Sequence, residues 1–310
     1  MKIAFVFPGQ GSQTVGMLNS WSENQAVAQV IERASAALDQ DLAALVADGP
    51  AEQLNLTTNT QPVMLAASYA MYQAYQEAGG PSPVLMAGHS LGEYSALTAA
   101  GSFTLEDAVR LVRVRADAMQ AAVPVGTGGM AAILGLDDDT VRKVCADAAQ
   151  AEVVEAVNFN APAQVVIAGH KAAVERACDL AKQAGAKRAL PLPVSAPFHS
   201  SLLKPAADVL EKALSGITIA MPSVNVINNV DVAVVTTPEG IRDALVRQAW
   251  HPVRWVETIQ AMKQQGITHI VECGPGKVLS GLVKRIEPGM TGVSIFDTAS
   301  LQAALETLKA

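Results

Sequence analysis

The chain has 310 residues, of which 50% are hydrophobic and 16% charged, with a formal net charge of -7. This apolar content excludes a disordered chain, and the length predicts two domains or one large domain with an insertion. The negative charge disfavours a nucleic-acid surface, because such surfaces are usually basic.

No segment predicts insertion into a membrane. The apolar N-terminal run stops at Pro8, which is too short for a signal peptide. The uncharged stretch of residues 118–136 contains a proline and four glycines and is typical of a helix end, a hinge and a strand. The cysteines are odd in number and lack metal-ligand spacing, so we expect reduced thiols in a cytoplasmic protein. They are Cys145, Cys178 and Cys273.

The first part of the sequence alternates buried strands with helices. Residues 3–7 and 84–87 are short, nearly all-apolar runs. Helical patterns occupy residues 62–77, 91–100 and 105–123. This alternation predicts a parallel sheet with both faces covered.

The pattern changes after residue 125. Strands are predicted at residues 130–134, 153–158, 164–168 and 189–194, and helices at residues 137–148 and 172–184. The order β-α-β-β-α-β is typical of a ferredoxin-like unit. A glycine-rich segment precedes it and a proline-rich segment follows it. We therefore expect an inserted ferredoxin-like α+β subdomain at residues 126–196.

The remaining sequence returns to the α/β pattern. Helices are predicted at residues 202–214, 241–248, 256–265 and 278–285, with a strand at residues 270–272. The fold class is therefore α/β, with a hydrolase-like parallel-sheet main domain formed by residues 1–125 and 197–310.

The segment Gly88-His89-Ser90-Leu91-Gly92 fits the pattern G-x-S-x-G. It follows a predicted strand and opens a predicted helix, the context in which this motif exposes a nucleophilic serine. The backbone N–H of Leu91 would point toward the same place from a helix N-terminus, where it could stabilise an oxyanion. The alternative is a glycine-bounded turn in which Ser90 only caps the helix.

A serine nucleophile needs a base, and the sequence has five histidines. His199 is the one that lies where the predicted subdomain returns to the main domain, and clefts between domains often hold sites. His89 adjoins the serine but would point away from it, so we interpret it as structural. From position alone, a structural role for His199 stays open.

Arg115 lies on the apolar stripe of its predicted helix, three residues after Val112 and four before Met119. Glu106 and Arg110, like Arg113 and Asp117, are spaced i, i+4 and form a solvated, self-paired face of that helix. An inward guanidinium requires an anion. That anion is either an acidic residue elsewhere in the chain or the carboxylate of a substrate.

With these residues in view, the chain resembles the malonyl-CoA:acyl carrier protein transacylase family of fatty acid synthesis. The resemblance covers nearly the whole chain and rests on several segments together. They are Phe7-Pro8-Gly9-Gln10-Gly11-Ser12-Gln13, Gly88-His89-Ser90-Leu91-Gly92-Glu93-Tyr94-Ser95-Ala96, Asn158-Phe159-Asn160, Pro193-Val194-Ser195-Ala196-Pro197-Phe198-His199-Ser200, Asn228-Asn229-Val230 and Gly274-Pro275-Gly276-Lys277-Val278-Leu279.

The resemblance implies roles for the catalytic residues. Ser90 is expected to carry the acyl group, with His199 as its base. Gln248 matches the position whose main-chain carbonyl orients that histidine, so no triad aspartate is expected. The backbone N–H groups of Gln10 and Leu91 match the oxyanion hole.

The resemblance also implies how the substrate is recognised. Arg115 matches the residue that grips the malonyl carboxylate. Phe198 stands where malonyl-selective relatives carry a bulky aromatic, and Asn160 is expected to contact the substrate. The implied reaction moves a malonyl group from malonyl-CoA to the thiol of an acyl carrier protein, without metal or tightly bound cofactor. We expect a monomer that does not bind nucleic acid or membranes.

Three other functions stay open at this point. A stand-alone malonyl loader for a polyketide synthase would share every motif. A serine thioesterase would share Ser90 and His199, but it has no need for an inward arginine matched to a free carboxylate. A carrier-binding scaffold with a dead site would never become acylated.

Overall fold

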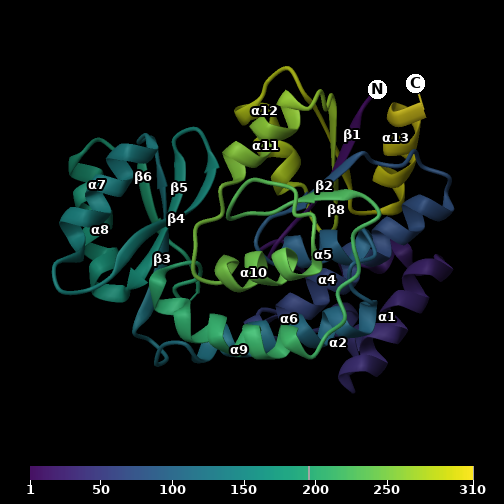
Figure 1. The fold of residues 1–310 in the computed structure, drawn as a ribbon, viewed down its shortest axis with the longest axis horizontal. Helices are drawn as coiled ribbons and strands as arrows, with labels where there is room; N and C mark the ends of the chain where they lie inside the picture. Colours follow the sequence, from purple (N-terminus) through teal and green to yellow (C-terminus); the bar gives the residue numbers. More distant parts are fainter. Residues whose placement is uncertain (195, 310) are drawn as a thin grey trace.

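A parallel sheet lies at the centre of the main body of the molecule (Figure 1). The computed structural model describes residues 1–194 and 196–309, and within them the sheet has five strands in the order β7-β2-β1-β8-β9. All neighbouring strands are parallel, which confirms the predicted sheet. β1 and β2 are buried at every residue, which explains their continuous apolar sequences. The strands are β1 (Ile3–Phe7), β2 (Leu85–Gly88), β7 (Asn225–Ile227), β8 (His269–Cys273) and β9 (Thr291–Ile295).

Successive residues of β1 point to opposite faces of this sheet, as the pleat requires. Phe5 packs on the rings of Tyr72 and Tyr75, with centroids 5.3 Å and 4.8 Å away. Ala4 and Val6 instead join a cluster on the opposite face. Both faces are thus covered, as the sequence predicted.

The helices divide between these two faces. The Phe5 side is covered by α1 (Gln25–Leu38), α2 (Leu42–Asp48), α3 (Ala51–Leu54), α4 (Thr57–Glu77), α5 (Leu91–Ala99), α6 (Leu105–Ala121), α9 (Lys204–Ser215), α10 (Pro238–Gln248) and α13 (Thr298–Lys309). The opposite side is covered by α11 (Trp255–Gln264) and α12 (Val278–Ile286). Short 3-10 turns lie at η1 (Asn19–Trp21) and η2 (Ser201–Leu203). Among the described helices, none has both the length and the apolar composition that a bilayer crossing requires.

Helix α4 begins earlier than the sequence pattern indicates. The sequence pattern predicts a helix over residues 62–77, yet the helix starts at Thr57 and includes Pro62. Thr60 Oγ1 donates to the carbonyl of Leu54 at 2.6 Å and stabilises the added first turn. Pro62 lies in the second turn, where the helix loses the hydrogen bond that its N–H would have made to the carbonyl of Thr58.

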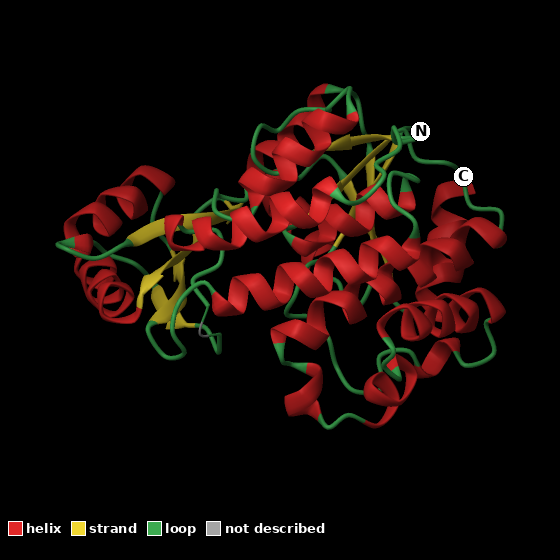
Figure 2. Cartoon of the chain, turned by 60° about the horizontal axis from the view of Figure 1, so that its bottom comes forward, coloured by secondary structure: helices red, strands yellow, loops and turns green. Residues whose placement is uncertain are grey.

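A second sheet stands apart from the main body, on the left in Figure 1 and in the turned view of Figure 2. Its order is β4-β5-β3-β6 and its neighbouring strands are antiparallel, as the ferredoxin-like pattern predicts. Cys145 and Cys178 lie in the apolar core between this sheet and its helices, as their spacing predicted. The elements are β3 (Gly128–Leu134), α7 (Asp138–Ala149), β4 (Val154–Ala161), β5 (Gln164–His170), α8 (Lys171–Gln183) and β6 (Arg188–Pro191).

Strand β4 connects this subdomain to the main body. Its Phe159 N–H donates to the carbonyl of Val253 at 3.0 Å, and Val253 N–H donates back to Val157 at 2.8 Å. Ala161, at the end of β4, joins the apolar cluster of α11 and α12. Ser195, in the proline-rich segment that returns from the subdomain, and Ala310 lie outside the described residues.

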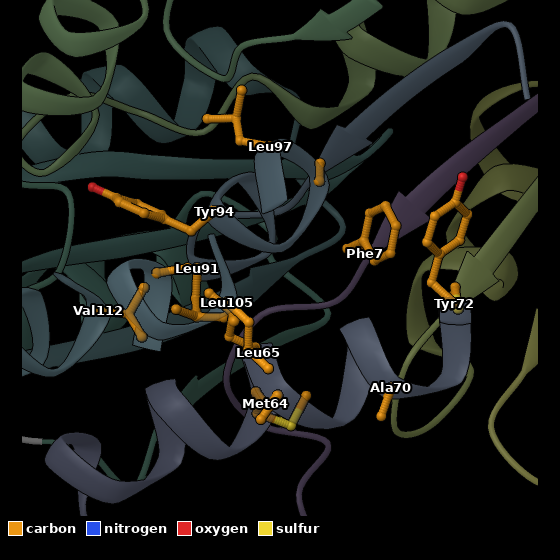
Figure 3. Packing of buried hydrophobic residues seen from close by; sticks show 14 of the residues in the cluster. Phe7, Met64, Leu65, Ala70, Tyr72, Leu91, Tyr94, Leu97, Leu105 and Val112 are labelled. Carbon is orange, nitrogen blue, oxygen red and sulfur yellow. The ribbon is translucent and has the colours of Figure 1, made fainter. Parts of the chain in front are cut away.

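The main-body core holds α5 firmly against its neighbours. Figure 3 shows Leu91 of α5 packed with Leu65 of α4 and Val112 of α6. All three are at most 1% exposed. Close packing of this kind tolerates little displacement, so the turn that precedes α5 has a rigid support.

Candidate active site

The turn between β2 and α5 places Ser90 at the carboxyl edge of the parallel sheet. Ser90 has φ 54° and ψ −113°, a region that residues with side chains rarely occupy. The flanking glycines are required by space. A Cβ on Gly88 would lie 1.8 Å from the backbone of Gly92, and one on Gly92 would lie 2.0 Å from the carbonyl oxygen of Phe7. This is the geometry of a nucleophile elbow.

His199 lies against the serine. Its Nε2 is 2.6 Å from Ser90 Oγ, and its Nδ1 is 2.8 Å from the main-chain carbonyl oxygen of Gln248. A carbonyl can only accept, so Nδ1 carries the proton and Nε2 is free to accept from Ser90. His199 also has a positive φ, 64°, and is 2% exposed. Two strained residues in contact, of which His199 is buried and Ser90 half-buried, are typical of a functional site.

The imidazole of His199 is neutral at pH 7. Burial, followed by the nearby positive charge of Arg115, lowers its pKa to about 3. The hydrogen bond to Gln248 acts in the opposite direction without overcoming these two effects. The ring is therefore in the form that can accept a proton.

Arg115 faces inward from α6, as its place on the apolar stripe predicts, and is 1% exposed. Its guanidinium donates to Oε1 of Gln61 at 2.8 Å, to Oε1 of Gln248 at 2.9 Å and to Ser90 Oγ at 3.2 Å. The ring of Tyr94 lies 5.2 Å away in a cation–π arrangement. In the described part of the chain no carboxylate forms a salt bridge with it, so the structural ion pair left open by the sequence is not made.

These groups line one cavity of about 140 Å³, between the main body and the subdomain. Gln10 and Leu91 border it beside Ser90, at the ends of two strands that pair in parallel. The subdomain contributes Met130 and Asn158 to the opposite wall. A space of this size suits a small acyl group rather than a long chain.

Phe198 borders the cavity, whereas Asn160 contacts His89. Phe198 is half-buried and borders the cavity. The Oδ1 of Asn160 is 2.7 Å from Nε2 of His89, so that its carbonyl oxygen holds the histidine beside the nucleophile. His89 also packs on Trp255 at a centroid distance of 5.4 Å, in agreement with its interpretation as structural.

The structure adds residues for which no role was predicted. Gln61 and Asn158 line the cavity, and the Oδ1 of Asn158 is buried without a hydrogen-bond partner among the described residues. Glu93 and Asn229 lie directly behind Ser90. Asn158, Glu93 and Asn229 stood within the recognised segments, but neither spacing nor periodicity indicated what they contact.

Known proteins match this chain along nearly its full length. Residues 4–292 match the family described as acyl transferase domain. The malonyl CoA-acyl carrier protein transacylase of Escherichia coli (strain K12) is 56% identical over 306 residues, which cover 98% of this chain and 99% of that protein.

Solved structures of transacylases are similar to this chain in both sequence and fold. The acyl-carrier-protein S-malonyltransferase of Burkholderia pseudomallei 1710b is 65% identical, with a TM-score of 0.97 over 99% of this chain and 100% of that one. A malonyl-transacylase in complex with its type II polyketide synthase (PKS) acyl-carrier protein is 52% identical, with a TM-score of 0.98 over 99% and 100% of the two chains. The chain therefore belongs to the acyl transferase family, among the malonyl CoA-acyl carrier protein transacylases.

Proposed function

We propose that this enzyme transfers the malonyl group of malonyl-CoA to the phosphopantetheine thiol of an acyl carrier protein through a malonyl-Ser90 intermediate, and so supplies fatty acid elongation. The observation that carries the proposal is the meeting of three groups in one small cavity. A serine in hydrogen-bond contact with a neutral histidine supplies the nucleophile. A buried arginine without an ion-pair partner among the described residues supplies the site for a free carboxylate.

The first half-reaction loads the serine. His199 Nε2 takes the proton of Ser90 as Oγ attacks the thioester carbonyl of malonyl-CoA. The backbone N–H groups of Gln10 and Leu91 hold the resulting oxyanion. When the C–S bond breaks, His199 returns the proton to the CoA sulfur, leaving malonyl-Ser90.

The second half-reaction reverses these steps with a different thiol. The carrier's pantetheine thiol gives its proton to His199 and attacks the ester carbonyl. Collapse of the second oxyanion returns the proton to Ser90 and releases the malonyl-carrier. Because Gln248 fixes the proton on Nδ1, Nε2 stays available for each transfer.

Binding of a malonyl group to Arg115 should also make His199 a stronger base. The charge of Arg115 helps to lower the pKa of His199. A malonyl carboxylate on Arg115 offsets that charge, so the pKa of His199 rises toward the range of an effective base. A substrate that lacks the second carboxylate leaves this depression in place.

The same site would serve polyketide synthesis, and one observation favours that second candidate. The 52% identical neighbour was solved with a polyketide synthase carrier, so this fold is able to dock such a partner. A thioesterase fits less well, because hydrolysis of a simple acyl thioester leaves Arg115 without a partner.

We also propose that residues 126–196 are the inserted subdomain and residues 1–125 and 197–310 the main domain. The separate apolar core of the antiparallel sheet supports this division. A cytoplasmic location is the third part of the proposal. Free, buried Cys145, Cys178 and Cys273 support a reducing compartment.

Intact-mass analysis after brief incubation with malonyl-CoA tests the function. The wild-type chain should gain one malonyl group and Ser90→Ala none. Addition of a carrier with its pantetheine arm should then discharge the wild-type adduct to the carrier. Discharge to water at the same rate without a carrier would identify a hydrolase, and no adduct at all would identify a scaffold. Comparison of fatty acid and polyketide carriers decides between the two transferase roles.

A further inference from the structure

Two side-chain amides hold the backbone of Ser90 from behind. Asn229 Oδ1 accepts from the Ser90 N–H at 2.9 Å, and its Nδ2 donates to the carbonyl of Gly88 at 2.7 Å. Gln248 Nε2 donates to the carbonyl of Ser90 itself at 2.8 Å. Both polar groups of a residue with strained dihedral angles are therefore bound to side chains, and these bonds favour the strained conformation.

Gln248 also holds Arg115. Its Oε1 accepts from the guanidinium at 2.9 Å, while its Nε2 faces Ser90 and Glu93. This orientation matters because an amide has a donor end and an acceptor end. Turned by half a rotation, Gln248 would present N–H groups to a cation and lose the bond that directs Arg115 toward the cavity.

Glu93 favours the same orientation of the Gln248 amide as the Ser90 carbonyl does. It is 2% exposed, and its Oε2 accepts from Gln248 Nε2 at 3.0 Å and from the backbone N–H of Asn229 at 3.0 Å. An ionised carboxylate only accepts, so it requires the donor end of Gln248. In the described part of the chain no cation forms a salt bridge with Glu93, and Arg115 faces it across the Gln248 amide.

We propose that Glu93 is a positioning residue for malonyl transfer and that it supplies, through Gln248, the counter-charge of Arg115 in the empty site. The proposal rests on the proposed function, because it assumes that Arg115 receives a substrate carboxylate. Its consequence is a competition: two carboxylates share one guanidinium, so the charge of Glu93 opposes the binding of the malonyl group. Release of the malonyl group to the carrier is thereby made easier.

The competition depends on pH, and its sign follows from the surroundings of Glu93. Burial raises the pKa of Glu93 to about 7, despite the hydrogen bonds from Asn229 and Gln248 and the charge of Arg115. The other ionisable groups facing Glu93 are Asp231 and Tyr94. Neither changes charge between about pH 6 and 8, because Arg247 lowers the pKa of Asp231 and burial raises that of Tyr94 to about 12. Below about pH 7 Glu93 is neutral, so Arg115 should bind the malonyl carboxylate more tightly.

The test measures binding without turnover. In a Ser90→Ala background, calorimetry gives the dissociation constants of acetyl-CoA and malonyl-CoA, and their ratio cancels the contribution of CoA. Adding Glu93→Gln keeps the size of the side chain and an acceptor for both hydrogen bonds but removes the charge. We expect the ratio at about pH 8 to rise roughly fivefold or more in favour of malonyl-CoA. Lowering the pH to about 6 should raise the ratio of Ser90→Ala by more than it raises that of the double variant.

Glu272→Gln in the same background is the matched control. Glu272 is also a buried glutamate with a raised pKa, but it binds the N–H of Ser280 at the start of α12. Its substitution should lower the melting temperature without changing the ratio.

A ratio that does not respond to Glu93→Gln, while Ser90→Ala still prefers malonyl-CoA, overturns the proposal for Glu93. Equal affinity of Ser90→Ala for both thioesters would instead overturn the role of Arg115 in the proposed function. If Glu93→Gln does not fold, a pH-independent ratio in Ser90→Ala is sufficient to reject the proposal.

Discussion

At the scale of single residues, Arg115 distinguishes a malonyl transferase from other serine acyl enzymes. Its guanidinium is buried among neutral acceptors, and two parallel charge-assisted hydrogen bonds to a carboxylate would complete its coordination. Acetyl-CoA offers no such group and leaves the guanidinium without a directly bonded carboxylate, at a cost of about 2–5 kcal/mol in a desolvated site. Selectivity is thus expected to arise because acetyl-CoA lacks the carboxylate that Arg115 binds.

Arg115→Ala should lower the rate of malonyl-Ser90 formation by roughly 10²-fold or more and leave the acetylation rate nearly unchanged or slightly higher. Arg115→Lys should restore only part of the malonyl rate, because an ammonium offers a point charge and not a fork. The measurement is the ratio of acylation rates with the two thioesters. If both rates fall together in Arg115→Ala, the residue has only a structural role.

His199→Ala should keep the fold and lose about 10²–10⁴-fold in acylation rate, the usual contribution of a general base. Rapid-quench measurement of malonyl-Ser90 formation gives the rate. His251→Ala is the control, since His251 is bound to the carbonyl of Arg247 at 2.7 Å and not to Ser90. A folded His251→Ala variant that is more impaired than His199→Ala would show that the base is assigned to the wrong histidine.

At the scale of elements, the sequence predicted the buried strands at the centre of the main sheet but not its two edge strands, β7 and β9. β1 and β2 are buried on both faces, so their sequences are unbroken apolar runs. β7 has only three residues, one of them exposed, and β9 begins at an exposed threonine and is mostly half-buried. Their pairing in the sheet depends on neighbours distant in the chain, which local patterns do not report.

The edge of the subdomain carries cations that suit an acidic carrier. Lys187 and Arg188 are exposed where β6 begins, at the open edge of the antiparallel sheet. The same β6 leads into Leu192 and Val194, which border the catalytic cavity. Lys182 and Lys204 extend the basic region along the sequence on either side.

Lys187→Glu combined with Arg188→Glu should raise the carrier's KM at low salt, while kcat at saturating carrier stays unchanged. The reason is electrostatic steering, which added salt screens. Steady-state transfer to the carrier at low and high salt measures the effect. Lys2→Glu with Lys263→Glu is the control, because Lys2 precedes β1 and therefore lies at the opposite edge of the sheet from the site. An unchanged KM in the first variant would place carrier docking elsewhere.

At the scale of the whole molecule, the shifted pKa values of His199 and Glu93 make the free energy of unfolding depend on pH. The pKa of His199 is about 3 in the folded chain and 6.5 as the ordinary value. Between these values the unfolded chain binds a proton that the folded chain does not, so the free energy of unfolding falls as pH decreases. Glu93 acts with the opposite sign between its ordinary value of 4.5 and its folded pKa of about 7.

Lowering the pH from about 7 to 5 should therefore remove roughly 2 kcal/mol of His199-dependent stability. His199→Ala lacks this contribution, so its loss of unfolding free energy over the same pH change should be smaller by that amount. Chemical denaturation of both proteins at the two pH values measures the difference. Parallel losses in the two proteins would mean that His199 is protonated in the folded state and accessible to water.

The sequence alone determined the alternation of strands and helices, the inserted β-α-β-β-α-β unit, the turn at Ser90 and the inward face of Arg115. Each depends on residues within a few turns of one another, so local periodicity and glycine spacing are sufficient to indicate them. Only the tertiary structure decided which groups meet. Ser90 and His199 are 109 positions apart, and Glu93 and Gln248 are 155 apart. The direction of the Gln248 amide, and with it the setting of Arg115, is decided by hydrogen-bond partners on two other segments, α6 and the turn into α5. No local pattern contains that information, because a buried amide takes its orientation from the donors and acceptors that the fold brings around it.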